Sequence, residues 1–418
     1  VGAANASFMG LHGDDLYLLS RHGATNGKVI RTSLKNPDLR QATTVYTDPK
    51  GVIQSLVWAR DGLYLKILEG GPSRLVRLPF DRIGQPDEIR LPDTGTVSVP
   101  GSGTNDTRLP GVAFTLGSWT RPGLYYAYDP RSENCTDTGV IPDWSPAISA
   151  RLTVKRVRVK SHDGMEIPLT IIHPQGLELN GKNPVLLSGY GAYGTSSEPR
   201  FNLGNVPFFE AGGIYAVAHV RGGGEYGESW RRAGFQDTKP NTWKDFIACA
   251  DYLVTAGYAS PQTICGMGRS AGGILIGRAI TERPDLFGAA VIGVGVCDAL
   301  RMEYSANGVP NIPEFGSVKT EQGFRALLEM SSYHQIKDGT AYPAVLLIHG
   351  ANDTRVDLWQ SMKMAARLQA ASAGGRPIWL RIDYSGGHGK GQGGEQKRAQ
   401  DADMLAFLLD HCGRSQKP

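Results

Sequence analysis

From residue 184 to residue 411 the sequence alternates between short apolar runs and longer segments with helical periodicity. Such repeated βα units predict a mostly parallel, doubly wound sheet, with right-handed crossovers and with functional residues at the carboxyl ends of the strands. The expected strands are 184–188, 214–220, 263–267, 289–296, 344–349 and 378–384, and the expected helices are 243–256, 271–282, 358–373 and 396–411. Asn241 and Thr242 are expected to cap the first of these helices.

The third expected strand runs into a Gly-x-Ser-x-Gly pattern formed by Gly268, Ser270 and Gly272. In the α/β-hydrolase fold this pattern is a sharp strand-to-helix turn that exposes a serine hydroxyl at the top of the sheet. The turn is strained and closely packed, so a Cβ at either glycine would clash. Because the chain has 54 glycines, an ordinary turn between a strand and a helix is the alternative interpretation of this stretch taken alone.

A serine nucleophile requires a base that is oriented by a carboxylate, and in this fold the chain order is serine, acid, histidine. Asp353 follows the strand 344–349 and lies where the acid is expected. Asp357 is the alternative, but it lies nearer to the next helix, where a capping role accounts for it.

The expected base is His388, which stands between glycines in the loop after the strand 378–384. His349 also ends a strand, and a hydrogen-bonded structural role accounts for it. Two donors are expected to stabilise an oxyanion. One is the N–H of Ala271. The glycine- and tyrosine-rich loop 187–194 offers a tyrosine hydroxyl as the other, but from the residues alone an aromatic side chain in a glycine-rich turn is the preferred interpretation.

Residues 1–150 differ in character from the rest, with short strands separated by turn residues. An Asp/Gly-Leu-Tyr element recurs at Leu16, Leu63 and Leu124, and loose repeats of this kind are typical of four-stranded propeller blades. Three blades do not close a propeller, so we expect an all-β propeller domain that is only partly present, with the other blades before Val1; an open sandwich is the alternative. The second domain, 151–418, begins with strands at 154–159 and 167–173.

The composition and the cysteine spacing argue against several classes of partner and site. The apolar fraction is 40% and the net charge is +4 without a basic run, so neither nucleic acid nor a membrane is an expected partner. The longest apolar runs, such as 289–296, are too short to span a bilayer. The five cysteines are widely spaced and show neither a disulfide framework nor a metal cluster, which favours a cytoplasmic location. No metal or cofactor is expected.

Together these residues resemble the prolyl oligopeptidase family of serine peptidases. The most specific stretch is residues 221–230, which read RGGGEYGESW. The other matching stretches follow in the family's order: 161–164, 189–191, 268–273, 353–356 and 387–389. The resemblance is strong over about residues 150 to 415, whereas residues 1–150 resemble the later blades of the family's seven-bladed propeller only in general character.

The resemblance implies an α/β-hydrolase catalytic domain that cleaves peptides, with a propeller that keeps folded proteins away. By position, Ser270 becomes the nucleophile, Asp353 the acid and His388 the base. The oxyanion donors become the Tyr190 hydroxyl and the Ala271 N–H. The substrate-binding positions that the resemblance implies are Arg355, which would hold a substrate carbonyl, and Tyr193, Val296 and Val356, which would line the pocket for the residue before the scissile bond (P1).

Three positions bear on specificity. Asn311 stands where proline-specific members have a tryptophan, and an amide lacks the aromatic face on which a proline ring stacks. Glu314 is an available carboxylate, and Arg269 replaces a glycine found in many members. We therefore expect a serine peptidase for short peptides whose P1 residue is not strictly proline, with isopeptide or cyclic substrates open. The alternatives are an esterase, acylaminoacyl hydrolase or transpeptidase on the same triad, and a catalytically silent peptide-binding protein.

Overall fold

The computed structural model describes residues 5–99, 106–389 and 393–413. Its contacts divide the chain into two compact units. The first takes the residues up to Ala150 together with residues 198–202 and 225–229, and the second takes the rest. Val1, before which we expect further blades, lies outside the described residues.

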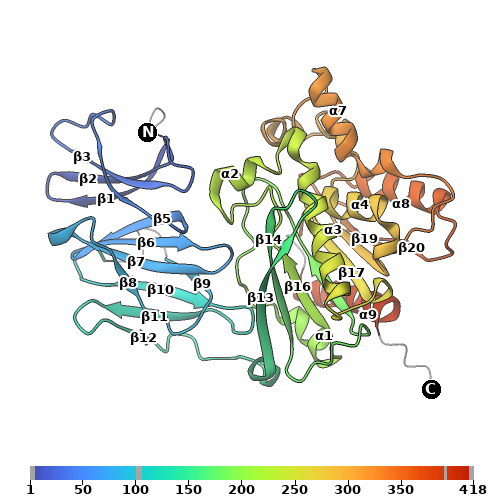
Figure 1. The fold of residues 1–418 in the computed structure, drawn as a ribbon, viewed down its shortest axis with the longest axis horizontal. Helices are drawn as coiled ribbons and strands as arrows, with labels where there is room; N and C mark the ends of the chain where they lie inside the picture. The colour runs from blue at the N-terminus through green and yellow to red at the C-terminus, as the bar shows by residue number, and fades with distance from the viewer. Residues whose placement is uncertain (1–4, 100–105, 390–392, 414–418) are drawn as a thin grey trace. The chain divides into compact units, whose positions relative to one another are not determined.

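The first unit consists of three four-stranded antiparallel sheets, each a simple meander (Figure 1). The first sheet contains β1 (Ala6–His12), β2 (Asp15–Ser20), β3 (Lys28–Ser33) and β4 (Thr43–Thr47). The second contains β5 (Val52–Ala59), β6 (Gly62–Leu68), β7 (Ser73–Pro79) and β8 (Asp87–Ile89), and the third contains β9 (Thr96–Ser98), β10 (Val112–Gly117), β11 (Leu124–Asp129) and β12 (Asn134–Asp137). Within the described residues, no strand of one sheet pairs with a strand of another.

The sheets pack face to face through apolar layers. In the second sheet Leu63 and Leu65 pack in one cluster with Leu19 and other residues of the first sheet. Tyr64 belongs to a second cluster, shared with the third sheet. The alternation follows from the two-residue period of a strand, which gives the central sheet two buried faces.

The sequence repeat marks equivalent strands in only two of the three sheets. Leu16 and Leu63 lie in the second strands of their sheets, β2 and β6, but Leu124 begins the third strand of its sheet. The strand equivalent to β2 and β6 in the third sheet is β10, so the element at Leu124 marks a different position in its sheet, although the four-stranded sheets that the repeat predicted are present. The element lies where the chain leaves a tight turn and begins an antiparallel strand. Because a meander has several such turns, the element can precede more than one of its strands.

The second unit is built on an eight-stranded sheet with the order β13-β14-β16-β15-β17-β18-β19-β20. In this order the six strands from β16 to β20 are parallel to one another. β14 is antiparallel to both of its neighbours, β13 and β16. Their bounds are β13 Leu152–Lys160, β14 Glu166–Pro174, β15 Val185–Ser188, β16 Ile214–Ala218, β17 Ile264–Arg269, β18 Ala289–Gly293, β19 Ala344–Gly350 and β20 Ile378–Asp383. The predicted parallel sheet is present, and the carboxyl ends of its six parallel strands lie at one edge.

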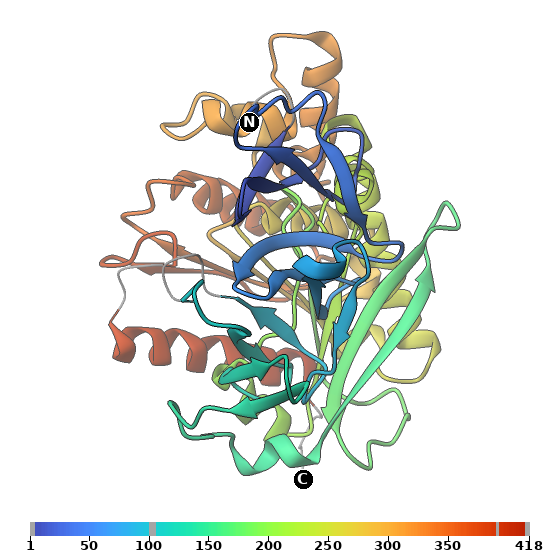
Figure 2. The same cartoon turned by 90° about the vertical axis from the view of Figure 1, so that its left-hand side faces the viewer.

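Helices cover both faces of this sheet (Figures 1 and 2). Phe208 of α1 and Leu408 of α9 pack on the face that carries Cys265. Gly266, the next residue of β17, faces Phe246 of α3 and Ile276 of α4. The helices are α1 Val206–Glu210, α2 Gly227–Arg232, α3 Pro240–Thr255, α4 Gly272–Glu282, α5 Ala299–Met302, α6 Ile312–Phe315, α7 Glu321–Met330, α8 Trp359–Ala371 and α9 Gly394–Cys412.

Two predicted boundaries need correction. The N-cap of α3 is Lys239, so Asn241 and Thr242 lie inside the helix and do not cap it. The strand expected at 289–296 ends at Gly293, because Val294 adopts a positive φ of 43° and turns the chain. None of the described helices combines the length and the apolar character that crossing a membrane requires.

Candidate active site

The turn at Ser270 has the geometry of a nucleophile elbow. Ser270 lies between β17 and α4 with a φ of 56°, a left-handed conformation that is uncommon for a residue other than glycine. A Cβ at Gly268 would lie only 2.4 Å from the carbonyl oxygen of Gly272. The glycines are therefore required by the packing of the turn, and the alternative of an ordinary turn does not account for the strained serine.

Three predicted residues from three loops form one hydrogen-bonded line. Ser270 Oγ lies 2.9 Å from His388 Nε2, and His388 Nδ1 lies 2.7 Å from Asp353 Oδ2. Asp353 follows β19 and His388 follows β20, so the parallel strands bring both side chains to the edge where β17 ends. Since the carboxylate accepts at Nδ1, Nδ1 carries the proton and Nε2 is free to accept from the serine.

The Asp353 carboxylate is buried and held from several sides. Its Oδ1 accepts the backbone N–H groups of Arg355 and Val356 at 2.9 and 3.0 Å. Burial alone would raise its pKa, but hydrogen bonds from His349, His388 and these backbone groups outweigh burial and hold the pKa well below its usual range. Asp353 is thus ionised over the whole range in which an imidazole titrates.

His349, the rival base, lies beside the same oxygen of Asp353 that accepts from His388. It is fully buried, its Nε2 donates to the Val356 carbonyl at 2.8 Å, and its Nδ1 accepts from Ser361 Oγ at 2.7 Å. Its Nε2 also lies 3.5 Å from Asp353 Oδ2. His349 therefore supports the acid, a role that we did not predict, although its place at the end of β19 beside Asp353 was a signal for it.

Asp357, the rival acid, does not take part in the line. Its Oδ2 accepts the indole N–H of Trp359 at 3.1 Å. The N-cap of α8 is Leu358, without a side-chain hydrogen bond, so the capping role that we assigned to Asp357 is wrong. A carboxylate two residues before a tryptophan reaches its indole N–H without occupying the cap position.

Two donors lie beside Ser270. In the described part of the chain the N–H of Ala271 donates to no acceptor, and it follows the serine at the start of α4. Tyr190 follows β15, and its hydroxyl lies near enough to Ser270 and Arg355 for both to lower its pKa. Burial raises the pKa of Tyr190 against the opposing effects of Arg355 and Ser270, so the hydroxyl keeps its proton and remains a donor.

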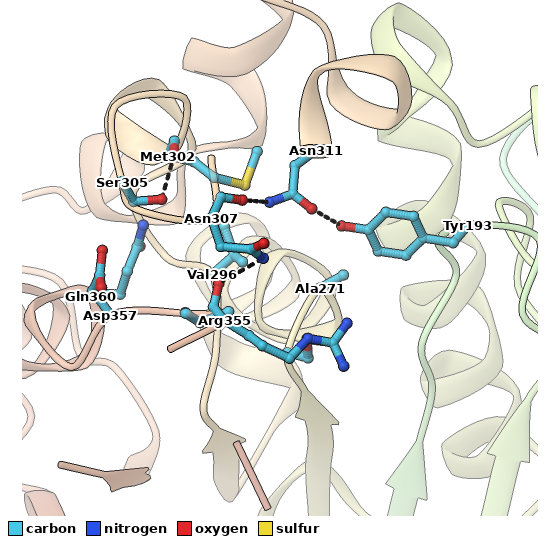
Figure 3. Close-up of a pocket in the computed structure, with 12 residues that line it drawn as sticks. Tyr193, Ala271, Val296, Met302, Ser305, Asn307, Asn311, Arg355, Asp357 and Gln360 are labelled. Carbon is cyan, nitrogen blue, oxygen red and sulfur yellow. Dashed lines mark hydrogen bonds between the residues drawn. The ribbon is translucent and has the colours of Figure 1, made fainter. Parts of the chain in front are cut away.

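A pocket opens next to Ser270 (Figure 3). All of the predicted substrate-binding residues line it, namely Arg355, Tyr193, Val296, Asn311 and Val356. Sequence reasoning missed the remaining wall, which comes from Met302, Ser305, Asn307, Asp357 and Gln360. Four of these lie on irregular segments or short helices, which carry no hydrophobic period that could have placed them.

The amide of Asn311 is held in the pocket wall by a short chain of hydrogen bonds (Figure 3). Tyr193 Oη donates to Asn311 Oδ1 at 2.6 Å, and Asn311 Nδ2 donates to the Asn307 carbonyl at 2.6 Å. Asn307 Nδ2 in turn donates to the Arg355 carbonyl at 3.2 Å. The wall at this position is therefore polar and fixed, in place of an aromatic face.

Glu314 is not an available carboxylate. It is buried, its Oε1 accepts the N–H of Tyr193 at 2.6 Å, and its Oε2 pairs with Arg231 at 2.8 Å. Arg269 lies outside the pocket wall, with its guanidinium against Gly293 and Gly389. By contrast, the Arg355 side chain extends into the pocket in Figure 3 and has no hydrogen-bond partner among the described residues.

The stretch 221–224 packs beneath the loop that carries Tyr190. Cβ atoms at Gly222 and Gly224 would lie 2.1 and 2.2 Å from the carbonyl oxygens of Gly191 and Gly194, so only glycine permits this approach. Arg221 is anchored by Asp245 and Asp163, at 2.6 and 2.5 Å. The motif therefore acts as a support for the loop.

No group of three or more His, Cys, Asp or Glu side chains suited to a metal ion occurs in the described residues. All five cysteines are free thiols.

Residues 199–415 match the sequence model of the prolyl oligopeptidase family, and residues 2–138 match the model of its N-terminal β-propeller domain. The chain is 33% identical to a prolyl endopeptidase of Elizabethkingia meningoseptica over 98% of its own length and 57% of that relative. It is 28% identical to a dual function macrocyclase-peptidase of Amanita bisporigera, over 96% of its own length and 55% of that relative.

Among solved structures, prolyl oligopeptidase B from Galerina marginata superposes with a TM-score of 0.91 at 26% identity, over 99% of this chain and 58% of that one. The chain thus spans somewhat more than half the length of the relatives that it matches. The family model covers residues 199–415, which is more than half of the 418 residues. With the triad-like geometry at Ser270 and the three-bladed β unit, these matches show that the chain belongs to the prolyl oligopeptidase family.

Proposed function

We propose that this chain carries the active site of a serine peptidase that hydrolyses short peptides through an acyl-enzyme. The observation that carries the proposal is the line from Ser270 through His388 to Asp353, with contacts of 2.9 and 2.7 Å. Family membership supports it, since the relative from Elizabethkingia meningoseptica is named a prolyl endopeptidase.

In the first step His388 Nε2 takes the proton of Ser270 as Oγ attacks the peptide carbonyl. The imidazolium that forms is stabilised by Asp353, whose low pKa keeps it charged. The Ala271 N–H and the Tyr190 hydroxyl donate to the oxyanion of the tetrahedral intermediate. His388 then gives its proton to the leaving amine.

In the second step water attacks the ester formed on Ser270. His388 accepts a proton from the water, and as the ester C–O bond breaks it gives that proton to Ser270 Oγ, which restores the serine and the neutral imidazole and releases the carboxylic acid product. The reaction needs no group beyond these side chains, which is why we propose no cofactor.

The pocket in Figure 3 is the proposed site for the P1 side chain. Val296 and Val356 give it apolar walls, whereas Asn311, Asn307 and Ser305 give it polar ones. The Arg355 guanidinium is the proposed donor to a substrate carbonyl. We therefore propose a P1 preference for compact residues, including ones that can hydrogen-bond, without a strict requirement for proline.

Peptide ligation is the second candidate function. It is favoured by the relative from Amanita bisporigera, which is named a dual function macrocyclase-peptidase. Chemically, an amine in place of water attacks the same ester and forms a new peptide bond. Hydrolysis of esters or acylaminoacyl groups would use the same acyl-enzyme.

Three further predictions remain proposals. A peptide is the proposed partner. The three sheets are proposed to form part of a larger propeller, supported by the match to the family's propeller domain and by the 57% coverage of a relative. The cytoplasmic location is supported by the five free thiols.

Mass spectrometry of a diverse peptide mixture, incubated with the protein and with Ser270→Ala, tests the proposal. Serine-dependent cuts at a shared P1 class support a peptidase, and serine-dependent joined products support ligation. Loss of the nucleophile is expected to lower kcat roughly 10⁶-fold. Equal cutting by both proteins would refute the assignment of Ser270, and no product from either would favour a silent binding protein.

A further inference from the structure

Lys239 is a buried lysine next to the candidate active site. Only 1% of its surface is exposed to solvent, and it occupies the N-cap position of α3. The ammonium donates to the carbonyl oxygens of Gly191 and Gly234, the latter at 3.1 Å, and lies 5.4 Å from the centre of the Phe315 ring. Burying a cation costs free energy unless hydrogen bonds and nearby charges compensate for it. We therefore ask what the contacts of this buried lysine do for the site.

The contact to Gly191 fixes the loop that holds both tyrosines of the site. Gly191 has a φ of 69° and directly follows Tyr190, and Tyr193 comes two residues later. A Cβ at Gly191 would lie 2.4 Å from Thr242, so the loop has no room to shift toward α3. Lys239 thus binds a backbone carbonyl that lies between the candidate oxyanion donor, Tyr190, and the pocket-wall residue Tyr193.

Further contacts tie the ends of the same loop. Gly189 N–H donates to the Met267 carbonyl at 3.2 Å, and Gly194 N–H donates to the Gly222 carbonyl at 3.1 Å. In the middle, the N–H of Tyr193 donates to Glu314 Oε1. The centre of the loop is therefore held by one buried cation and one buried anion.

The charged groups that face the Lys239 ammonium are Glu314 of α6 and Arg231 of α2. Glu314 and Arg231 also pair with each other at 2.8 Å. The three side chains form a charge cluster in which Lys239 and Glu314 are buried and Arg231 is partly exposed; Glu314 accepts from the Tyr193 backbone, and Lys239 donates to the Gly191 backbone.

We propose that Lys239 is a positioning residue, which holds the loop 189–194 so that the Tyr190 hydroxyl lies at the oxyanion position. The inference rests on the proposed function of Ser270 and goes beyond it, because Lys239 touches neither substrate nor the reacting atoms. Its charge matters because a hydrogen bond from an ammonium to a carbonyl is stronger than one from a neutral amine.

Titration of Lys239 is expected to change kcat with pH. Burial lowers the pKa of Lys239 to about 8, while Glu314 raises the pKa and Arg231 lowers it. Above that pH the lysine is neutral and its bond to Gly191 weakens, so kcat falls on the alkaline side. A lysine whose folded pKa lies below its unfolded value favours the folded state more as the pH rises between the two, so this loss of activity is not an unfolding.

The test compares Lys239→Met with Lys244→Met, a lysine on the same helix that contacts no part of the loop among the described residues, in the full chain. The Lys239 variant is expected to lose kcat about 10- to 100-fold, which is less than the roughly 10²- to 10³-fold loss for complete removal of one oxyanion donor, because the Tyr190 hydroxyl is misplaced but still present. The control is expected to keep the kcat and the KM of the unmodified chain.

A double-mutant cycle with Tyr190→Phe separates positioning from general damage. If Lys239 acts through Tyr190, Lys239→Met costs less than about threefold when the hydroxyl is already absent. A full and multiplicative loss in the double variant would overturn the proposal, and so would full activity of Lys239→Met.

The pH profile gives a second, independent readout. Removal of Arg231 as Arg231→Gln is expected to move the alkaline limb of kcat to higher pH, because a cation that lowers the pKa of Lys239 is lost and Glu314 is released from its pair. An unchanged limb or a shift to lower pH would overturn the assignment of that limb to Lys239.

Hydrogen exchange of the loop 189–195 distinguishes failure of this inference from failure of the proposed function. Faster exchange of the Tyr193 and Gly194 amides in Lys239→Met, with Lys244→Met unchanged, supports the holding role even if no Ser270-dependent turnover is found. Unchanged exchange would overturn the role even if the chain is an active peptidase.

Discussion

Replacement of Asp353 by asparagine probes the candidate triad with almost no change in shape. The carboxylate faces two sets of partners: Oδ1 accepts two backbone N–H groups, from Arg355 and Val356, and Oδ2 accepts from His388 Nδ1. His349 Nε2 also lies 3.5 Å from Oδ2. An amide has one oxygen and one NH₂ group, so its orientation decides which partner loses its bond.

The amide oxygen of the substituted side chain is expected to keep the hydrogen bonds from the backbone N–H groups of Arg355 and Val356. If the amide turned the other way, two buried N–H groups would face an NH₂ group, at a cost of about 1–3 kcal/mol each. The NH₂ group therefore faces His388 Nδ1, which must become the acceptor. The imidazole proton then sits on Nε2, which points at Ser270 and can no longer take its proton.

We predict that Asp353→Asn lowers kcat about 10⁴-fold, the scale found when the acid of such a triad becomes an amide. This corresponds to about 5.4 kcal/mol of lost transition-state stabilisation. The measurement is kcat/KM on a fluorogenic peptide, with the melting temperature as a check on folding. Asp403→Asn is the matched control and is expected to change kcat less than threefold, because its carboxylate pairs with Arg381 and lines no part of the pocket next to Ser270. Activity of Asp353→Asn within tenfold of the unmodified chain would refute the reasoning.

Three other substitutions have defined outcomes. Tyr190→Phe is expected to lower kcat about 10²- to 10³-fold with little change in KM, measured on the same peptide, and an unchanged kcat would contradict its role as an oxyanion donor. Gly268→Ala is expected to destabilise the fold by about 3 kcal/mol in urea titrations, since the added methyl meets a backbone oxygen at 2.4 Å, whereas Gly123→Ala meets nothing within 4 Å and is expected to be neutral. Asn311→Trp is expected to raise the preference for proline over alanine at P1 about tenfold, by supplying an aromatic face, and an unchanged ratio of kcat/KM values would contradict the account of the pocket.

The sequence was informative about residues at the ends of parallel strands. Ser270, Asp353 and His388 follow three strands that the hydrophobic runs predicted, and parallel strands must end at one edge of the sheet. Because this geometry is fixed by the backbone topology, chain order alone was enough to bring these residues to one place.

The pocket wall was less accessible to sequence reasoning. Met302 and Asn307 lie in a segment of short helices, whose course depends on tertiary packing and not on a hydrophobic period. The burial of Glu314 was equally invisible, because its partners Arg231 and Tyr193 lie more than eighty residues away. The sequence around Lys239 gives no sign of its burial, because the groups that enclose it come together only in the folded chain.

The central claim is that Ser270 is an activated nucleophile. Intact-mass spectrometry after incubation with a peptide phosphonate, followed by peptide mapping, tests it most directly. The account predicts a single adduct on Ser270 in the unmodified chain. It predicts no adduct on Ser270→Ala, and no adduct formed at a measurable rate on His388→Ala. No adduct under conditions in which the chain is folded, or an adduct on another residue, would contradict it.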